Sequence, residues 1–372
     1  MRITYVLPHG WRFAGWSLED VLRRYHFSKH LAYAESRLGH EVTLLLLHED
    51  VRAPVVVQTE PYRIEVLPVT ASIPFLRFGG DFSQPLLRRL SELRADVVHI
   101  HGCFYESLPL LVRVPRAPVV VQWHGGRLLP LRNPGLRIAY SHVRRVILPF
   151  QAARNLLGRL GSDTSKLAVV PMPLRAEADA ASPRASYGRP GTRLLYVGRI
   201  ARPGGNLWER RLDILLRILG RMRSVAFSLD VVGEGPGEPE CRRIALGLGM
   251  EGSVAFRGYL TMDRLLQFYR DADLTVAPFY LSDLTGTWVA QLQESLALGV
   301  PVAAFAPDGR FSEHEVGWRI SADPTAGSSQ LTSILANPEG LEKKGRRGTT
   351  LVRALCNEDV VARQLESVYR DL

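Results

Sequence analysis

The chain has 372 residues, which exceeds the size at which a single hydrophobic core stops growing, so we expect two domains. Hydrophobic residues make up 46% of the chain and charged residues 23%, as in a soluble globular protein, and no apolar run approaches the roughly 18 residues of a membrane span. The 47 Lys and Arg against 37 Asp and Glu give a net charge of +10, which favours an anionic partner: a nucleotide diphosphate, an acidic membrane surface or nucleic acid. The N-terminus lacks the charged-then-apolar pattern of a secretory signal, so we expect a cytoplasmic protein.

Apolar strands alternate with helical segments through the first half of the chain. Strands are predicted at residues 2–7, 42–47, 63–69, 96–101 and 119–123, with helical segments up to residue 38 and at 85–93. Ser17 is expected to cap the first helix, with Asp20 in the first turn. This alternation predicts a parallel, doubly wound sheet, in which ligands bind beyond the carboxyl ends of the strands.

Four histidines lie within these strands or just after them. His9, His101 and His124 follow strand ends, where each could donate a hydrogen bond or carry a proton near neutral pH, or could be an ordinary satisfied loop residue. His99 lies inside its strand, two positions before His101 and on the same face. We therefore expect a core role for His99.

Residues 136–160 combine apolar positions with many arginines and almost no acidic residue. Such a basic amphipathic stretch is compatible with an anionic membrane surface. The competing interpretation, which we favour, is a buried strand at 146–150 between two surface helices.

The segment 176–191 is rich in Ala, Ser, Pro, Gly and Arg without hydrophobic periodicity, which indicates a linker. Beyond it, strands are predicted at 194–197, 227–232, 254–256, 273–279 and 300–305, and helices at 263–269 and 358–369. The glycine-rich loop 233–237 is a weak signal, because it lacks the spacing of a dinucleotide fingerprint and the GK[ST] ending of a phosphate-binding loop. Three scattered cysteines, Cys103, Cys241 and Cys356, support neither a disulfide framework nor a cysteine metal site.

The stretch 271–305 is organised as strand, glycine-bearing loop, helix and strand. A connection from a strand through a loop into a helix leaves free backbone N–H groups and the positive end of the helix dipole at the start of the helix. Such a helix start favours phosphate binding. Leu292 and Leu296 would bury one helix face, whereas Thr287, Gln291 and Glu294 form a separate polar stripe. The alternative is an ordinary βαβ unit with a solvated polar face.

Several motifs together resemble the family 4 type of glycosyltransferases, also called glycosyl transferases group 1. The motifs are YVGRI at 196–200, RRLDILLRIL from 210, LDVVGEGP at 229–236, FRGYL at 256–260 and ESLALGVPV at 294–302, with looser matches at GHEVT (39–43) and HIHG (99–102). The resemblance implies a GT-B fold, in which two Rossmann-like domains face each other across a cleft. We expect an acceptor-binding domain at 1–175, a nucleotide-sugar-binding domain at 192–357, and a helix at 358–372 that crosses back to the first domain.

The resemblance also implies a retaining, metal-independent transfer of sugar from a nucleotide diphosphate, UDP or GDP, to a glycan, lipid-linked or small-molecule acceptor, with no further cofactor. Arg199 matches the diphosphate-binding arginine of the family and Arg210 is the best match to its lysine. Glu294 matches the second acid of the E-x7-E pattern, which usually holds the donor ribose. The first acid is absent, because Gly286 stands in its place, and Asp283 is a candidate replacement.

His101 matches the family's histidine near the sugar, and Gly10 or Gly15 would approach the diphosphate. The remaining candidate donor contacts are Gly233, Arg257 and Tyr259, together with the loop residues Leu284, Thr285, Gly286 and Thr287.

Two alternatives follow from the missing acid and from the fold. One is a nucleotide-sugar-binding protein or inactive transferase subunit, and the other is a nucleotide-sugar epimerase of related GT-B shape. Peripheral association with the inner face of an anionic membrane stays open, whereas nucleic-acid binding is not expected because no RNA- or DNA-binding motif accompanies the charge.

Overall fold

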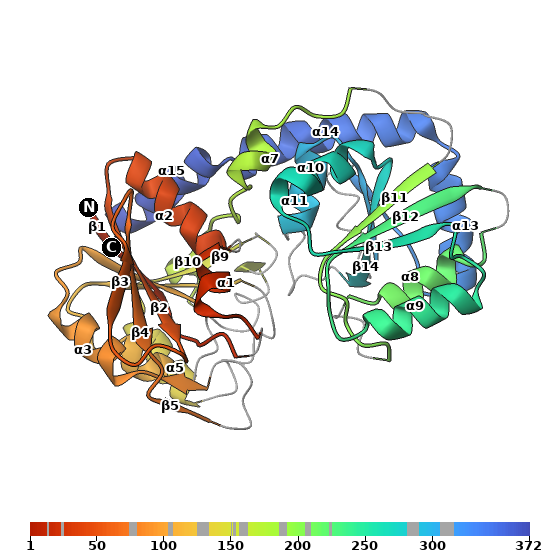
Figure 1. Cartoon of the computed structure of the whole chain (residues 1–372). Helices are drawn as coiled ribbons and strands as arrows, with labels where there is room; N and C mark the ends of the chain where they lie inside the picture. The colour runs from red at the N-terminus through yellow and green to blue at the C-terminus, as the bar shows by residue number, and fades with distance from the viewer. Residues whose placement is uncertain are drawn as a thin grey trace. The chain divides into compact units, whose positions relative to one another are not determined.

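The computed structural model describes residues 1–12, 15–23, 26–73, 80–102, 107–124, 134–149, 151, 154–155, 163–185, 192–204, 210–222, 225–280, 290–305 and 316–372. The chain divides into two compact units (Figure 1). The first contains Met1–Pro173 together with Glu358–Leu372, and the second is the continuous segment Leu174–Asn357. Each unit is an α/β structure with its own sheet and core.

In the described part of the first unit, an eight-stranded sheet has the order β10-β9-β8-β7-β1-β2-β4-β3. Neighbouring strands are parallel except β3, which runs antiparallel to β4 at the edge of the sheet. The strands are β1 Arg2–Leu7, β2 Glu41–His48, β3 Val55–Gln58, β4 Arg63–Pro68, β7 Val97–His101, β8 Val119–Gln122, β9 Arg145–Leu148 and β10 Leu167–Val169, and a separate pair is formed by β5 Ala71–Ser72 and β6 Asp81–Phe82.

Helices flank this sheet, and one of them comes from the far end of the chain. The helix α15, Glu358–Arg370, packs against α2, Phe27–Arg37, and is drawn in dark blue beside the red α2 in Figure 1. Its buried Val361, Leu365 and Tyr369 belong to the same core as β1 and β2. The other helices of the unit are α1 Leu18–Arg23, α3 Gln84–Glu92, α4 Leu108–Leu111 and α5 Pro134–His142.

The residues described in the second unit form a parallel six-stranded sheet in the order β13-β12-β11-β14-β15-β16. This is the Rossmann strand order, with its topological switch point between β11 and β14. The predicted GT-B class of two Rossmann-like halves is therefore confirmed. The strands are β11 Thr192–Val197, β12 Phe227–Val232, β13 Val254–Gly258, β14 Leu274–Tyr280, β15 Val302–Phe305 and β16 Gly317–Arg319.

The helices of the second unit are α7 Ala176–Ala180, α8 Leu212–Leu219, α9 Glu238–Gly247, α10 Met262–Asp271, α11 Ala290–Ala297, α13 Pro324–Leu335 and α14 Pro338–Cys356. The segment 176–191 was expected to be a linker between the domains. In the structure it begins with α7 and belongs to the second unit. Arg184 forms an ion pair with Asp273 at 2.8 Å, and its backbone N–H donates to the Leu298 carbonyl. Composition alone does not reveal such long-range contacts.

The helix α11 is buried on all sides rather than along one stripe. Gln291 and Glu294 are buried as well, because the Tyr269 hydroxyl of α10 donates to the Gln291 carbonyl and to the Glu294 carboxylate, and Arg175 forms an ion pair with Glu294. The helix α14 packs against α11 on the side of Leu296. Close packing of these two helices requires a glycine: a Cβ on Gly348 of α14 would lie 2.6 Å from Leu296 Cδ2. The solvated polar face considered as an alternative is therefore wrong.

Two other expectations bear on partners. β9 is a buried strand that follows α5, as favoured for the 136–160 stretch over a membrane-bound amphipathic segment. Among the described residues, no helix is long and apolar enough to span a bilayer. Cys241 and Cys356 are free, buried thiols, and Cys103 lies outside the described residues.

Candidate active site

Three loops of the second unit are joined where β11, β12 and β13 end. The Gly198 N–H donates to the Val232 carbonyl at 2.9 Å, the Ile200 N–H to the Glu234 carbonyl at 3.0 Å, and the Gly233 N–H to the Gly258 carbonyl at 2.8 Å. These bonds fix the loop after β11, which carries Arg199.

The glycine-rich loop 233–237 owes its composition to this close backbone contact. A Cβ on Gly233 would lie 2.1 Å from the Gly198 carbonyl oxygen, and a Cβ on Gly237 would lie 1.8 Å from that of Ala201. Side chains are therefore excluded at these positions by the neighbouring backbone. Close backbone packing explains why residue 233 is a glycine. Its contact with the donor stays a prediction.

Arg199 and Arg210 are brought to the same loop. Arg199 is exposed, and its carbonyl oxygen accepts a 2.6 Å hydrogen bond from the Tyr196 hydroxyl. The Arg210 side chain lies directly against Gly198, since a Cβ there would be 2.7 Å from Arg210 Nη1. The Arg211 N–H donates to the Pro278 carbonyl of β14 at 2.7 Å, which fixes the start of α8 beside the switch point. The Arg210 side chain thus lies beside the residue that precedes Arg199, in the region where a Rossmann sheet binds its ligand.

Glu294 is 3% exposed and has two partners that the sequence did not indicate. Its Oε2 accepts a 2.9 Å hydrogen bond from the Tyr269 hydroxyl, and its Oε1 lies 3.1 Å from Arg175 Nε. Burial raises the pKa of Glu294, while Arg175 and the Tyr269 hydroxyl act in the opposite direction. Arg175 was overlooked because it directly precedes the supposed linker, and no local pattern pairs it with a residue so distant in sequence.

Arg257 and Tyr259 lie on either side of Gly258 at the end of β13. The Arg257 guanidinium binds Asp230 of β12 at 2.7 Å and lies over the Phe268 ring. The Tyr259 side chain is exposed, and its N–H donates to Glu234 Oε1 at 3.3 Å. Of these two residues, Tyr259 is therefore the one whose backbone is bonded to the loop after β12, at Glu234.

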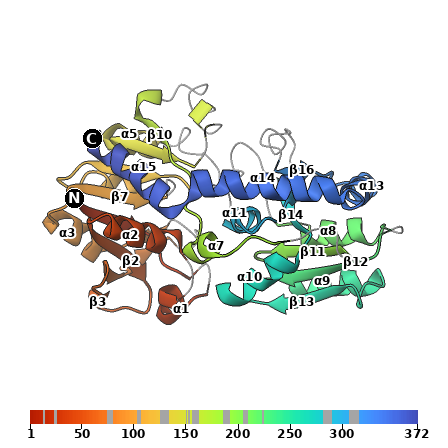
Figure 2. The same ribbon diagram turned by 90° about the horizontal axis from the view of Figure 1, so that it is seen from above.

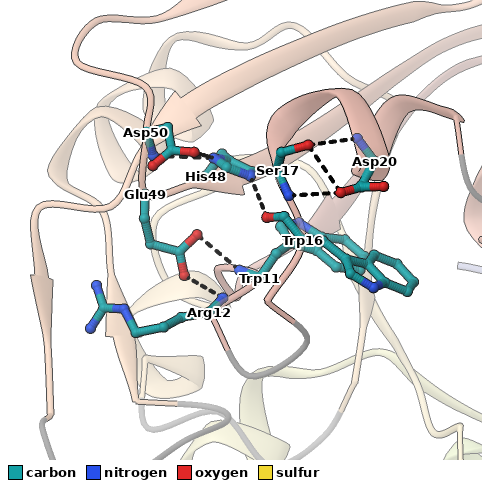
Figure 3. A network of polar contacts seen from close by, with 8 residues as sticks. All are labelled: Trp11, Arg12, Trp16, Ser17, Asp20, His48, Glu49 and Asp50. Atoms are coloured by element: carbon teal, nitrogen blue, oxygen red, sulfur yellow. Dashed lines mark hydrogen bonds and ion pairs between the residues drawn. The ribbon is translucent and has the colours of Figure 1, made fainter. Parts of the chain in front are cut away.

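In the first unit, carboxylates bind the amides that follow β1 (Figure 3). The N–H groups of Trp11 and Arg12 donate to Glu49 at 3.0 and 2.7 Å. The Gly10 N–H donates to Asp81 Oδ2 at 2.8 Å. A Cβ on Gly10 would lie 2.3 Å from Glu49 Oε1, so this glycine serves the close approach of a carboxylate. Gly15 instead has a φ of +66°, and its N–H closes a turn onto the Trp11 carbonyl.

The same loop is continued by a capped helix and a tryptophan stack (Figure 3). The Asp20 N–H donates to Ser17 Oγ at 3.1 Å, as predicted for a capping serine. The Trp11 and Trp16 rings stack with their centroids 5.3 Å apart, and His48 Nε2 lies 3.3 Å from the Trp16 carbonyl oxygen. These contacts make the loop a structured part of the first unit.

Buried histidines line the carboxyl ends of β7 and β8. His101 Nδ1 lies 3.1 Å from His124 Nε2, and the His101 ring also stacks on His99. His99 itself contacts the Tyr369 hydroxyl at 2.6 Å, which confirms its core role. Burial lowers the pKa of His9, His101 and His124 and lowers that of His99 to about 3, so these rings are neutral at pH 7. Of the two functional roles considered, hydrogen bonding therefore fits better than proton carrying.

The remaining predicted donor contacts lie outside the described residues. They are Asp283, Leu284, Thr285, Gly286 and Thr287.

Two family models match the chain. "Glycosyl transferase 4-like domain" matches residues 26–173, and "Glycosyl transferases group 1" matches residues 191–337. The phosphatidyl-myo-inositol mannosyltransferase of Mycobacterium tuberculosis is 26% identical over 387 aligned positions, covering 99% of this chain and 96% of the relative. The D-inositol 3-phosphate glycosyltransferase of Acidothermus cellulolyticus is 30% identical over 243 positions, covering 61% of this chain and 53% of the relative.

A solved structure resembles the whole chain. Anabaena Alr3699/HepE in complex with UDP superposes with a TM-score of 0.70 at 14% identity, and all of both chains is covered. At this identity the likeness establishes the shared fold.

Proposed function

Because the chain belongs to the group 1 glycosyltransferases of GT-B fold, we propose that it transfers a sugar, with retention, from a nucleotide diphosphate sugar to an acceptor. The observation that supports the proposal is that the Arg210 side chain packs against Gly198, directly before the exposed Arg199, at the carboxyl ends of the strands of the second unit. We assign donor binding to residues 192–357 and acceptor binding to residues 1–175.

Cleavage of the glycosidic bond leaves its electron pair on the departing diphosphate. Fixed cations and N–H donors aimed at this developing charge lower the barrier, and two guanidinium groups supply them without a metal ion. Arg210 suits a bidentate phosphate contact, although it is not chemically equivalent to the lysine that the family usually has.

Retention follows if the acceptor hydroxyl attacks the anomeric carbon on the face from which the diphosphate leaves. The hydroxyl proton then passes to the leaving phosphate oxygen, so no protein base is needed. In this scheme His101 acts as a neutral hydrogen-bonding contact to the sugar, consistent with the lowered pKa that burial gives it. Glu294 accepts hydrogen bonds from the ribose hydroxyls.

The acceptor that we propose is a cyclitol such as an inositol or an inositol phosphate. This choice is supported by the names of two relatives, one acting on phosphatidyl-myo-inositol and the other on D-inositol 3-phosphate. UDP is the first donor nucleotide to test, because it is the ligand of the structurally similar Anabaena protein.

The test is a transfer assay with UDP-, GDP-, ADP- and dTDP-sugars against myo-inositol and its phosphates. Product NMR should show the donor's anomeric configuration retained. Arg199→Ala and Arg210→Ala should each reduce kcat about 100-fold or more, since each removes a donor to the leaving group. Arg242→Ala is the matched control, because Arg242 is an exposed arginine paired with Glu238 on α9. Unchanged turnover in both site variants, or no thermal shift with any nucleotide, would refute the proposal.

A second candidate, nucleotide-sugar binding without transfer, is favoured by Gly286 in the position of the first family acid. It predicts nucleotide-dependent thermal shifts and no sugar transfer or donor hydrolysis. Restoring the acid with Gly286→Glu would then generate turnover, whereas in an active enzyme the same change should not be required.

A further inference from the structure

Arg175 lies at the start of α7, within reach of the carboxylate expected to hold the donor ribose. Figure 2 shows α7 next to α10 and α11 of the second unit, in agreement with their contacts. Arg175 Nε is 3.1 Å from Glu294 Oε1, and Arg175 Nη1 is 3.1 Å from Met262 Sδ of α10. The side chain is 17% exposed, so it is held between two helices.

The backbone on both sides of Arg175 is tied to the end of α14. The Leu174 N–H donates to the Cys356 carbonyl at 2.6 Å, and Asn357 Nδ2 donates to Asp179 Oδ2 at 2.5 Å. Arg353 Nη2 also reaches the Ala181 carbonyl at 2.5 Å. These hydrogen bonds therefore fix the backbone that carries the Arg175 side chain.

The two partners of Glu294 lie on different oxygens of its carboxylate. A carboxylate offers about four lone-pair sites; the Tyr269 hydroxyl takes one of them on Oε2, whereas Arg175 Nε contacts Oε1 as an ion pair. With respect to the described residues, each oxygen therefore keeps a lone pair for a further donor. Two donors on adjacent atoms, as in a vicinal diol, match this remaining pair.

Charges around the carboxylate decide whether it can serve as an acceptor. Burial favours the protonated form of Glu294 and raises its pKa, and the neighbouring Glu177 adds to this effect. Arg175 lowers the pKa of Glu294 most, followed by the Tyr269 hydroxyl. Burial and Glu294 raise the pKa of that hydroxyl, whereas Arg175 and Arg210 lower it. Removing Arg175 would leave burial opposed mainly by one neutral hydroxyl.

We propose that Arg175 is a positioning residue for donor binding, which orients Glu294 so that the carboxylate accepts the 2′- and 3′-hydroxyls of the donor ribose. This inference rests on the proposed function and assigns to it a residue outside the motifs of the family. Arg175 also favours the ionised form of the carboxylate against the effect of burial, so its influence on binding should depend on the ribose hydroxyls and on pH.

The experiment measures the Kd of UDP, GDP and their 2′,3′-dideoxy forms by calorimetry, for the wild type, Arg175→Gln, Arg175→Lys and Tyr269→Phe. The wild type should prefer the ribonucleotide about tenfold or more, as expected for hydrogen bonds to a charged acceptor. In Arg175→Gln this preference should fall towards one, while the Kd of the dideoxynucleotide stays within about twofold. Arg175→Lys should restore part of the preference, because it returns the charge without the guanidinium geometry.

A pH series provides a second readout. Ribonucleotide affinity should fall as the pH drops through the pKa of Glu294, and this fall should occur at higher pH in Arg175→Gln, where the stabilising cation is missing. Arg184→Gln is the matched control: it removes another buried arginine ion pair of the same unit, with Asp273, and should lower Tm without changing the ribose preference.

Each other outcome contradicts the inference in a distinguishable way. Equal loss of affinity for ribo- and dideoxynucleotide in Arg175→Gln would show a merely structural role. A wild type that binds both forms equally would remove the ribose role of Glu294 while leaving the transferase proposal intact. A wild type that binds neither UDP nor GDP, nor any other nucleotide of the transfer assay, would overturn the proposed function together with this inference.

Discussion

Glu35 of α2 is a fully buried carboxyl group in the core of the first unit. Burial raises its pKa to about 8, although the hydroxyls of Tyr5 and Tyr369 favour its ionised form. Glu366, from α15, adds a smaller influence that also raises the pKa. Since Tyr369 further contacts His99, this polar cluster joins α2, β1, β7 and α15.

At this single residue we predict a pH-dependent effect of Glu35→Gln. Between pH of about 4.5 and 8 the folded protein keeps a proton that the unfolded chain has released, so the stability contributed by Glu35 is present at low pH and lost as pH rises through about 8. The Gln variant does not lose this stability at high pH, because its side chain cannot ionise. Its Tm should exceed that of the wild type increasingly from pH 5 to about 8 and by a constant amount above that, with a stability difference of a few kcal/mol, since each tenfold change in proton affinity is worth about 1.4 kcal/mol. A Tm difference that is constant across this range would contradict the assignment.

At the scale of elements, the loops after β11 and β12 depend on each other. The glycines of loop 233–237 allow its backbone to approach residues 198–201 closely, and Arg199 is part of that backbone segment. Arg199, the arginine proposed to bind the donor diphosphate, is therefore held in place by a loop to which it does not belong.

Gly237→Ala should both destabilise the second unit and reduce transfer. Its Cβ would overlap the Ala201 carbonyl, and overpacking of this kind costs about 1–3 kcal/mol. Displacement of Arg199 should also lower kcat. Gly247→Ala, in the last turn of α9, is the matched control: nothing lies within 4 Å of its added Cβ, so stability should rise by up to about 1 kcal/mol with kcat unchanged. Chemical unfolding and initial rates measure both effects, and equal behaviour of the two variants would disprove the packing argument.

At the scale of the whole molecule, the sheets were largely predictable. Buried parallel strands are continuous apolar runs, so β1, β2, β4, β7, β8, β11, β12, β13 and β14 were placed from sequence within one or two residues. The exposed edge strand β3 and the short β10 lack such a run and were missed. The local motifs named Arg199, Arg210 and Glu294 as candidate donor-binding residues, and these roles stay predictions. The pairing of Glu294 with Arg175 joins residues far apart in sequence, and no local pattern indicates it.

The first unit should depend on α15 for its stability. Leu365 is fully buried in the core shared with β1 and β2, so Leu365→Ala should cost about 2–5 kcal/mol. Arg363→Ala, on the exposed side of the same helix, should change stability by less than about 0.5 kcal/mol. Hydrogen exchange should show the loss in Met1–Pro173 and Glu358–Leu372 and not in the second unit. Loss of protection spread evenly over both units would contradict this dependence.

The division of the first unit into two sequence segments has a consequence for biosynthesis. The ribosome completes Leu174–Asn357, a continuous unit, before it makes Glu358–Leu372. At about 5–20 residues per second, the N-terminal segment waits roughly 10–40 s for its last helix. During that interval the apolar surface that later receives Val361, Leu365 and Tyr369 is without its cover. The unit whose translation begins first is thus the last to be completed, and its nascent form exposes apolar surface that the finished protein buries.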